Sequence, residues 1–260
     1  MTSREERLRM LGMKGPVFSV SDPEKYRKGL KLIEEAIAPL GIFASDNLIT
    51  WNRNLSFLRD NFFNQFLNDK NIDQKYRAIV WRLYILTYFA KISLNVEGDF
   101  MELGVLEGTT VEQVLKKIDF TKSGKSYYLY DLFDWKDDYK HDPHKELKDK
   151  NLYSKVKNKF KKYDCVKIIK GKVPDTLLKE MPDKVAFAHI DLNHPDPEEG
   201  ALKMILPRLS DSGIIVFDDY GWWSYSAQKK VLDPIVSDYG LSILELPTGQ
   251  GLLIKNHGKS

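Results

Sequence analysis

The sequence predicts an α/β protein in which a doubly wound, mostly parallel sheet follows an N-terminal helical extension. From residue 99 onward, short apolar segments typical of strands alternate with segments whose apolar residues recur at helical spacing. Such alternation is typical of a parallel sheet that is covered by helices on both faces. Residues 1–98 show helical spacing instead. We therefore expect a helical extension over residues 1–98 and an α/β domain over residues 99–260.

The N-terminal extension is expected to contain three helices. The first follows Ser21-Asp22-Pro23-Glu24, a combination typical of a helix start. A second apolar stripe consists of Leu55, Leu58, Phe62 and Phe66. The third helix, residues 76–94, is apolar nearly all round, so we expect it to be buried. Between the first two helices we expect a loop over residues 41–53. Within the N-terminal extension, this loop is the candidate for a lid over the active site or for a dimer surface.

The α/β domain begins with a strand at Asp99, which leads through two glycines into a helix over residues 111–118. The further strands are expected at residues 126–132, 166–170, 184–192, 213–220, 242–246 and 251–255. The helices between them are expected at residues 144–163, 174–181, 196–209 and 224–236. The last two strands follow each other without a helix, so we expect a polar hairpin turn between them.

The composition argues against two classes of partner. A net charge of +3 over 260 residues is too small to indicate nucleic-acid binding. Residues 145–172 contain 11 lysines against three acids, but no arginine and few aromatic residues, so a solvated helix face is favoured there. The longest apolar run, residues 78–90, is short and interrupted by Arg82, so we expect no membrane span.

Cysteine usage indicates the redox compartment. Cys165 is the only cysteine, so no disulfide can form within the chain. The first residues also lack the apolar segment of a secretory signal. We therefore expect a reducing, cytoplasmic environment.

The turn Glu102-x-Gly104-x-x-x-Gly108 joins the first strand to its helix and is the first candidate binding site. Glycines allow close approach of a ligand, and a helix N-terminus favours an anion such as a carboxylate. The spacing is not the dinucleotide fingerprint, and an acid before the first glycine suits a cationic amine rather than a phosphate. S-adenosylmethionine (SAM) has an amino acid end with both charges. An ordinary strand–turn–helix corner is the alternative.

Acidic residues stand at three further strand ends, where an open α/β sheet binds its ligands. Asp131 ends the second strand, where an acid can bind ribose hydroxyls or simply cap a turn. Asp191 ends the fourth strand, and Asp218 and Asp219 end the fifth. If these strands are neighbours, three carboxylates converge, and oxygen ligands favour Mg²⁺ or another hard divalent ion. The alternative is that some of the three cap helices and face water.

In combination, five segments of the sequence resemble the macrocin O-methyltransferase family. The resemblance extends from about residue 53 to residue 255. Its segments are Glu102-Leu-Gly104-Val-Leu-Glu-Gly108, Asp131-Leu-Phe-Asp, Gly171-Lys-Val-Pro-Asp175-Thr-Leu, His189-Ile-Asp191 and Asp218-Asp219-Tyr220-Gly221. Members of that family are SAM-dependent enzymes that methylate sugar hydroxyls with the help of a divalent metal.

The resemblance implies a seven-stranded SAM-binding sheet and a small-molecule acceptor, with a sugar favoured. It implies Mg²⁺, or another hard divalent cation, at Asp191, Asp218 and Asp219. The cofactor contacts that we expect from the motifs and from the resemblance together are Glu102, Gly104, Val105, Gly108, Thr109, Asp131, Gly171 and Asp191.

One departure from the family concerns the catalytic base. The family usually has Asp-x-Asp after the fourth strand, and its second Asp is suggested as the base, but this chain has Asp191-Leu192-Asn193. An amide does not accept that proton. Either a metal acidifies the acceptor hydroxyl at this site, or His194 or Asp196 takes the proton. Asp191, Asn193, His194 and Asp196 are therefore the candidate catalytic residues.

Two other functions are alternatives to an O-methyltransferase. A non-catalytic SAM-binding or scaffold protein is supported by Asn193 alone, while three clustered carboxylates argue against it because such charges destabilise a protein that does not use them. A nicotinamide-dependent oxidoreductase disagrees with the glycine spacing and with Glu102. The aromatic-rich N-terminal helices are compatible with a homodimer.

Overall fold

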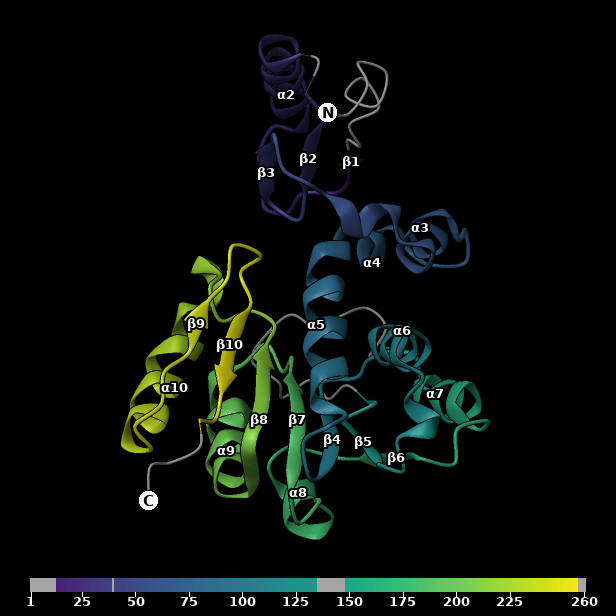
Figure 1. Cartoon of the computed structure of the whole chain (residues 1–260), viewed down its shortest axis with the longest axis vertical. Helices are drawn as coiled ribbons and strands as arrows, with labels where there is room; N and C mark the ends of the chain where they lie inside the picture. The colour runs from purple at the N-terminus through teal and green to yellow at the C-terminus, as the bar shows by residue number, and fades with distance from the viewer. Residues whose placement is uncertain (1–12, 39, 135–147, 257–260) are drawn as a thin grey trace. The chain divides into compact units, whose positions relative to one another are not determined.

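The structure is a computed structural model that describes residues 13–38, 40–134 and 148–256. The chain divides into two compact units, residues 1–84 and 85–260 (Figure 1). The division falls inside helix α5 (Val80–Ser93), earlier than the boundary expected at residue 98. The reason is that Leu86 and Ala90 of α5 belong to the hydrophobic core of the second unit.

The first unit contains a small sheet, so its expected all-helical character is wrong. Its strands β1 (Met13–Lys14), β2 (Ile42–Ser45) and β3 (Leu48–Trp51) lie side by side in that order. Residues 41–53, expected as a loop, thus form a hairpin. Its two turn residues, Asp46 and Asn47, have φ of 52° and 56°. Positive φ at both positions is the preferred geometry of a two-residue hairpin, and Asp and Asn tolerate it well.

The helices of the first unit begin at acidic caps. Asp22 accepts a hydrogen bond from the Lys25 amide at the start of α2 (Pro23–Ile37), and Asp60 caps Phe62 at the start of α3 (Asn61–Asn68). The Asp60 cap divides the expected second helix into a short η1 (Ser56–Arg59) and α3. The expected third helix is likewise divided, into α4 (Gln74–Ala78) and α5.

The second unit is built on a seven-stranded sheet in the order β6-β5-β4-β7-β8-β10-β9. The first five strands of this order are parallel, and only β10 and β9 run antiparallel to their neighbours. This confirms the expected mostly parallel sheet of seven strands. The strands are β4 (Asp99–Leu103), β5 (Tyr127–Asp131), β6 (Val166–Lys170), β7 (Val185–Ile190), β8 (Leu209–Phe217), β9 (Leu244–Glu245) and β10 (Gly251–Ile254).

Helices cover both faces of this sheet, as the doubly wound prediction requires (Figure 1). On one face, α5, α6 (Thr109–Ile118) and α7 (Leu152–Phe160) pack against Phe100, Tyr127 and other side chains of alternate strand positions. On the other, α8 (Asp175–Lys179), α9 (Pro195–Ile205) and α10 (Ser226–Asp238) pack against Met101, Leu103 and their neighbours. Successive strand residues therefore face different cores, which is why these strands are apolar throughout.

Strand β8 begins earlier than expected. The predicted helix to residue 209 ends at Ile205, and after one turn of 3-10 helix (Leu206–Arg208) the strand starts at Leu209, opposite Val185 of β7. The polar run Ser210-Asp211-Ser212 hides this start, because it has the composition of a turn. The predicted helix over residues 144–163 is α7 in its described part, and residues 135–147 lie outside the described residues.

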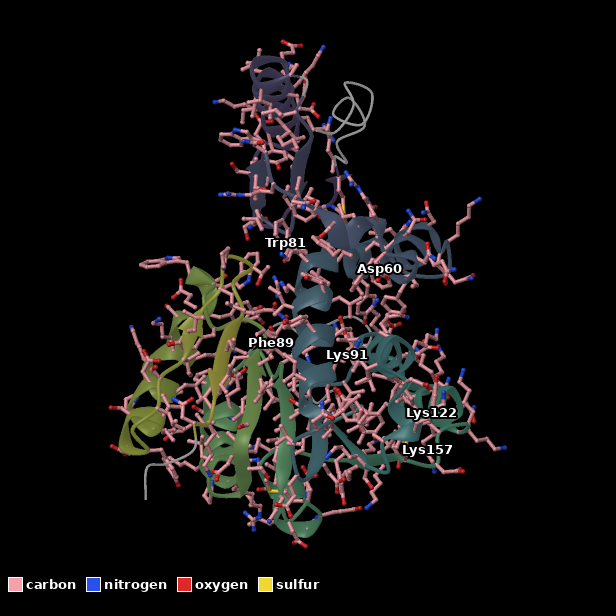
Figure 2. All side chains as sticks on the ribbon, viewed as in Figure 1. Asp60, Trp81, Phe89, Lys91, Lys122 and Lys157 are labelled. Carbon is pink, nitrogen blue, oxygen red and sulfur yellow. The ribbon has the colours of Figure 1, made fainter. Side chains whose placement is uncertain are left out.

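Within the described part of the lysine-rich segment, lysines lie on the outer face of α7. Leu152, Val156 and Phe160 are buried, while Lys155 and Lys157 are exposed, and Figure 2 shows Lys157 pointing away from the sheet. This supports the interpretation of the lysines as a solvated helix face.

In the described part of the chain, no helix is long and apolar enough to cross a bilayer.

Candidate active site

The glycine turn after β4 lies at the carboxyl edge of the sheet, and its glycines are required by the backbone. Gly104 has φ +92°, and a Cβ there would lie 1.8 Å from the Asp191 carbonyl oxygen on the neighbouring strand end. Gly108 has φ +70° and precedes the first residue of α6, Thr109; its Cβ would meet the Phe160 ring. The close approach at Gly104 thus lets the ends of β4 and β7 lie together. The same turn places the amino end of α6 at this edge, where its backbone amides favour an anion.

Asp131 at the end of β5 fixes this turn. Its carboxylate accepts hydrogen bonds from the backbone amides of Val105 (2.8 Å), Leu106 (2.7 Å) and Phe133 (2.7 Å). Leu106 and Phe133 both have positive φ, which is uncommon for bulky residues. The expected contact with ribose hydroxyls is compatible with this geometry and stays a prediction.

Gly171 follows β6 at the same edge. Its φ is +145°, and its amide donates to the Asp131 carbonyl at 2.9 Å. The structure therefore brings Gly171 next to the end of β5. Its expected cofactor contact also stays a prediction.

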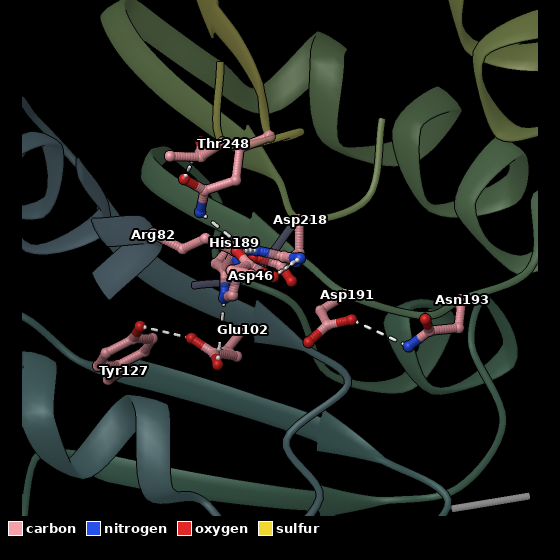
Figure 3. A network of polar contacts seen from close by, with 10 residues as sticks. Asp46, Arg82, Glu102, Tyr127, His189, Asp191, Asn193, Asp218 and Thr248 are labelled. Carbon is pink, nitrogen blue, oxygen red and sulfur yellow. Dashed lines mark hydrogen bonds and ion pairs between the residues drawn. The ribbon is translucent and has the colours of Figure 1, made fainter. Parts of the chain in front are cut away.

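Glu102 lies inside the sheet rather than in the turn. Its carboxylate, 1% exposed, accepts a hydrogen bond from the Tyr127 hydroxyl (3.0 Å), and its other oxygen lies 3.2 Å from His189 Nδ1 (Figure 3). The partner that we expected for Glu102 was the amine of the cofactor. In the structure both carboxylate oxygens have partners from the neighbouring strands β5 and β7.

His189 is a site residue whose role the sequence analysis missed. It lies between Glu102 and Asp218, with Nε2 3.6 Å from Asp218 Oδ1. Burial alone would lower the pKa of His189, but the two carboxylates raise it well above its ordinary value. His189 thus lies between a carboxylate of β4 and one at the end of β8, and both carboxylates favour its protonated form. The available signal was a histidine next to the last residue of the otherwise apolar strand β7.

Asp191, Asp218 and Asp219 meet at the ends of β7 and β8, as the sequence predicted for neighbouring strands. Each offers a carboxylate oxygen, and these oxygens lie within 4.8 Å of one another. Burial and the charges of Asp218 and Asp219 raise the pKa of Asp191 well above its ordinary value. Three carboxylates so close repel one another, so a cation fits between them, and an all-oxygen donor set suits Mg²⁺.

A turn near the C-terminus supports this cluster. The turn between β9 and β10 is closed by the Leu246 amide, which donates to the Gln250 carbonyl at 2.8 Å, so the expected hairpin turn is confirmed. The Gln250 side-chain amide donates to Asp218 at 3.2 Å, and the Thr248 hydroxyl donates to Gln250 at 3.1 Å (Figure 3). Gln250 therefore orients one member of the carboxylate cluster, a role that the sequence analysis did not foresee.

The candidate bases follow Asp191 along the chain. Asn193, with φ +56°, donates from its side-chain amide to Asp191 at 3.0 Å, so it orients that carboxylate (Figure 3). His194 is the N-cap of α9, where its Nδ1 accepts from the Asp196 amide at 3.3 Å. The Asp196 side chain is 85% exposed and lies 4.0 Å from His194. The structure thus gives Asn193 and His194 local structural roles and places Asp196 at the surface.

A family model and several solved structures are similar to this chain. The model described as Macrocin-O-methyltransferase (TylF) matches residues 88–233. The structure of the O-methyltransferase NovP has a TM-score of 0.55 at 20% identity, over 68% of this chain and 81% of NovP. CalS11, a calicheamicin methyltransferase, has a TM-score of 0.60 at 16% identity, over 91% and 95%; its apo structure is described as a TDP-rhamnose 3'-O-methyltransferase.

A third similar structure is the methyltransferase PaMTH1 of Podospora anserina with bound S-adenosylhomocysteine. Its TM-score is 0.50 at 15% identity, over 95% of this chain and all of PaMTH1 (100%). At these identities the structures establish a shared fold. No curated protein has a matching sequence.

Proposed function

Because this chain belongs to the macrocin O-methyltransferase family, whose model matches residues 88–233, we propose that it methylates a sugar hydroxyl with the help of a divalent cation. The chain is a SAM-dependent O-methyltransferase. The acceptor and the cation are the proposed parts. The observation that carries the proposal is the cluster of Asp191, Asp218 and Asp219 at the carboxyl edge of a methyltransferase sheet.

SAM is proposed to bind at the turn between β4 and α6. The amino end of α6 at Thr109 favours the cofactor carboxylate, since helix N-termini bind anions. Asp131 holds the turn in place from the end of β5, where an acid can bind ribose hydroxyls. Gly104, Val105, Gly108 and Gly171 belong to the same edge. Glu102 is proposed to support the turn from inside the sheet, where it contacts Tyr127 and His189.

The proposed cation site consists of Asp191, Asp218 and Asp219, with Asn193 and Gln250 orienting two of them. A divalent ion bound there would stabilise the developing alkoxide of the acceptor. In the reaction the acceptor oxygen bonds to the SAM methyl carbon while the carbon–sulfur bond breaks, and the hydroxyl proton leaves. His194 and Asp196 are the side chains nearest in sequence that can take this proton, because Asn193 cannot.

A sugar is proposed as acceptor for two reasons. The matching family model is described as Macrocin-O-methyltransferase, and CalS11, described as a TDP-rhamnose 3'-O-methyltransferase, has the same fold over most of both chains. Neighbouring hydroxyls of a sugar can also supply two oxygens to one hard cation.

The proposal is tested by methyl transfer from labelled SAM to a panel of glycosides and nucleotide sugars, with Mg²⁺ or with a chelator. We expect transfer to at least one sugar, loss of transfer on chelation, and loss in Asp191→Ala. Asp238→Ala, which removes an exposed acid on α10, is the control and should leave transfer unchanged. Transfer that persists with the chelator would overturn the proposed cation requirement. Methylation of non-sugar hydroxyls only would overturn the proposed sugar acceptor.

A further inference from the structure

The turn between β9 and β10 lies beside the end of β8 because β10 runs antiparallel to β8. In the ladder of these two strands, Gly251 of β10 stands opposite Phe217, the last residue of β8. The residues before Gly251 therefore continue past the carboxyl end of β8, where Asp218 and Asp219 follow. A parallel strand would instead begin at the opposite edge of the sheet. The antiparallel strand order thus brings the turn of residues 246–250 to the carboxylate cluster.

This turn and the segment that follows β8 are in close contact. The Gly221 amide donates a hydrogen bond to the Gly249 carbonyl at 2.8 Å. A Cβ at Gly249, whose φ is +82°, would lie 2.1 Å from Trp222 Nε1, and a Cβ at Gly251 would lie 2.8 Å from Tyr220 Cβ. Both distances are shorter than a real Cβ tolerates, so the close approach requires glycine at these two positions. The turn and the segment are therefore fitted to each other.

Gln250 makes the contact that reaches the cluster itself. Its side chain is 1% exposed, and its amide nitrogen donates to Asp218 Oδ1 at 3.2 Å. Its amide oxygen accepts from the hydroxyl of Thr248, a buried residue, at 3.1 Å (Figure 3). An ionised carboxylate only accepts hydrogen bonds, so Asp218 requires the nitrogen end of the amide. The Thr248 hydroxyl selects the same orientation from the other end.

The orientation of this amide matters because Gln250 is a neutral group beside acids. With its nitrogen toward Asp218 it stabilises the charge of that carboxylate, whereas its oxygen there would place two acceptors against each other. His189 Nε2 lies 3.6 Å from the same oxygen, Asp218 Oδ1. Contacts from β7 and from the turn before β10 thus meet at one oxygen of Asp218 and restrict the rotation of its carboxylate.

We propose that the turn of residues 246–250 is a positioning element of the cation site, in which Thr248 fixes the amide of Gln250 and Gln250 fixes the carboxylate of Asp218. The inference rests on the proposed function in assigning Asp218 to a cation. Removing a partner that orients a ligating carboxylate typically lowers metal affinity by about 10–100-fold. The structural part of the proposal needs no ligand, because the hydrogen bonds involved lie within the chain.

Hydrogen exchange of single amides, followed by NMR in protein without metal and without SAM, tests the structural part. The Gly221 amide reports the contact with the turn, and the Lys255 amide, bonded to the Gly213 carbonyl at 2.9 Å, reports the other end of the β8–β10 ladder. In Gln250→Leu we expect exchange at Gly221 to accelerate by about tenfold, since a buried hydrogen bond to a charged group is lost. Exchange at Lys255 should stay as in wild type. Unchanged exchange at Gly221, or equal acceleration at both amides, would overturn the proposal.

Cation binding is the second readout, with Mn²⁺ as the probe because carboxylates bind it as they bind Mg²⁺. Electron paramagnetic resonance measures the free Mn²⁺. In Gln250→Leu we expect Mn²⁺ affinity to fall by about tenfold while SAM affinity, measured by calorimetry, stays unchanged. Thr248→Val keeps the shape of the side chain but loses the hydroxyl, so its Mn²⁺ affinity should fall to a smaller extent. Thr248→Ser keeps the hydroxyl and should retain most of the affinity.

The matched control is Thr121→Val, at an exposed threonine of the 3-10 helix Phe120–Lys122, which should bind Mn²⁺ like wild type. Wild-type Mn²⁺ affinity in both Gln250→Leu and Thr248→Val would overturn the positioning role. If wild-type protein binds no Mn²⁺ while exchange at Gly221 responds as expected, the proposed cation site fails and the structural role of the turn stands.

Discussion

Asp131 shows how one side chain can determine the shape of two turns. Its carboxylate accepts hydrogen bonds from backbone amides in the turn after β4 and in the turn after β5, including those of Leu106 and Phe133. Both residues have positive φ, a conformation that costs on the order of 1–3 kcal/mol each in non-glycine residues. Charge-assisted hydrogen bonds of about 1.5–3 kcal/mol offset such costs. The carboxylate is therefore a structural requirement of the turn between β4 and α6, in addition to any contact with a cofactor.

Replacing the Asp131 carboxylate by an amide should lower both stability and SAM affinity, whereas the same change at an ordinary surface acid should not. In Asp131→Asn, one acceptor oxygen becomes a donor that faces backbone amides, so we expect unfolding free energy to fall by roughly 1–3 kcal/mol. SAM affinity should fall about tenfold to a hundredfold. Denaturant titration and calorimetry measure the two effects. Asp134→Asn, at a neighbouring exposed acid, serves as control; equal SAM affinity in both variants would contradict the assignment.

Asn193 stands where the family has its second acid, and in this chain it orients Asp191. Its amide donates to Asp191, so Asn193→Asp replaces an attraction by a fourth nearby negative charge. We expect the metal-free variant to lose roughly 1 kcal/mol of unfolding free energy, because like charges repel at this distance. Saturating Mg²⁺ should raise its melting temperature more than that of wild type. A variant that melts like wild type without metal would contradict this role of Asn193.

At the scale of elements, the ends of β7 and β8 give the metal-free protein a characteristic pH dependence. The pKa of Asp191 and of Glu198 is raised in the folded state by burial and neighbouring carboxylates. A raised pKa means that the folded state binds these protons more tightly than the unfolded chain. Their contribution to stability is therefore present at low pH and is lost as pH rises through the raised values.

Thermal melts from pH 5 to pH 8 check this dependence. We expect metal-free wild type to lose stability across this range relative to Asp191→Asn, in which one proton site of the cluster is removed. Saturating Mg²⁺ should flatten the wild-type curve, since a bound cation replaces the protons. Parallel curves for the two proteins without metal would contradict the raised pKa of Asp191.

The elements that were predictable from sequence are those with a strong local signal. The apolar strands and their acidic ends identify the edge of the sheet, because parallel strands carry ligand groups at their carboxyl ends. The hairpin of the first unit was missed although Asp46-Asn47 between two apolar runs is a turn signal. Partnerships across strands were not predictable: that Glu102 faces His189 depends on the register of β4 against β7, which no local pattern contains.

For the whole second unit, stability depends on the two cores on either side of the sheet. Phe100 is fully buried and lies with its ring centroid 4.9 Å from Phe120 and 5.1 Å from Phe187. Phe100→Ala should lower unfolding free energy by about 3–5 kcal/mol, the usual cost of such a cavity. Leu178→Ala, at a side chain that is 76% exposed, should change it little. Equal denaturation midpoints for the two variants would contradict this account of the core.

The line of polar side chains across the sheet has a genetic consequence. Tyr127, Glu102, His189, Asp218 and Gln250 come from distant parts of the chain, yet each contacts the next within an otherwise apolar interior. Removing one member leaves a buried partner unsatisfied, whereas changing two together restores the balance. Such positions are therefore expected to change together. Revertants selected from a Glu102→Gln strain should therefore arise at Tyr127 or His189, and homologues should exchange these residues jointly rather than singly.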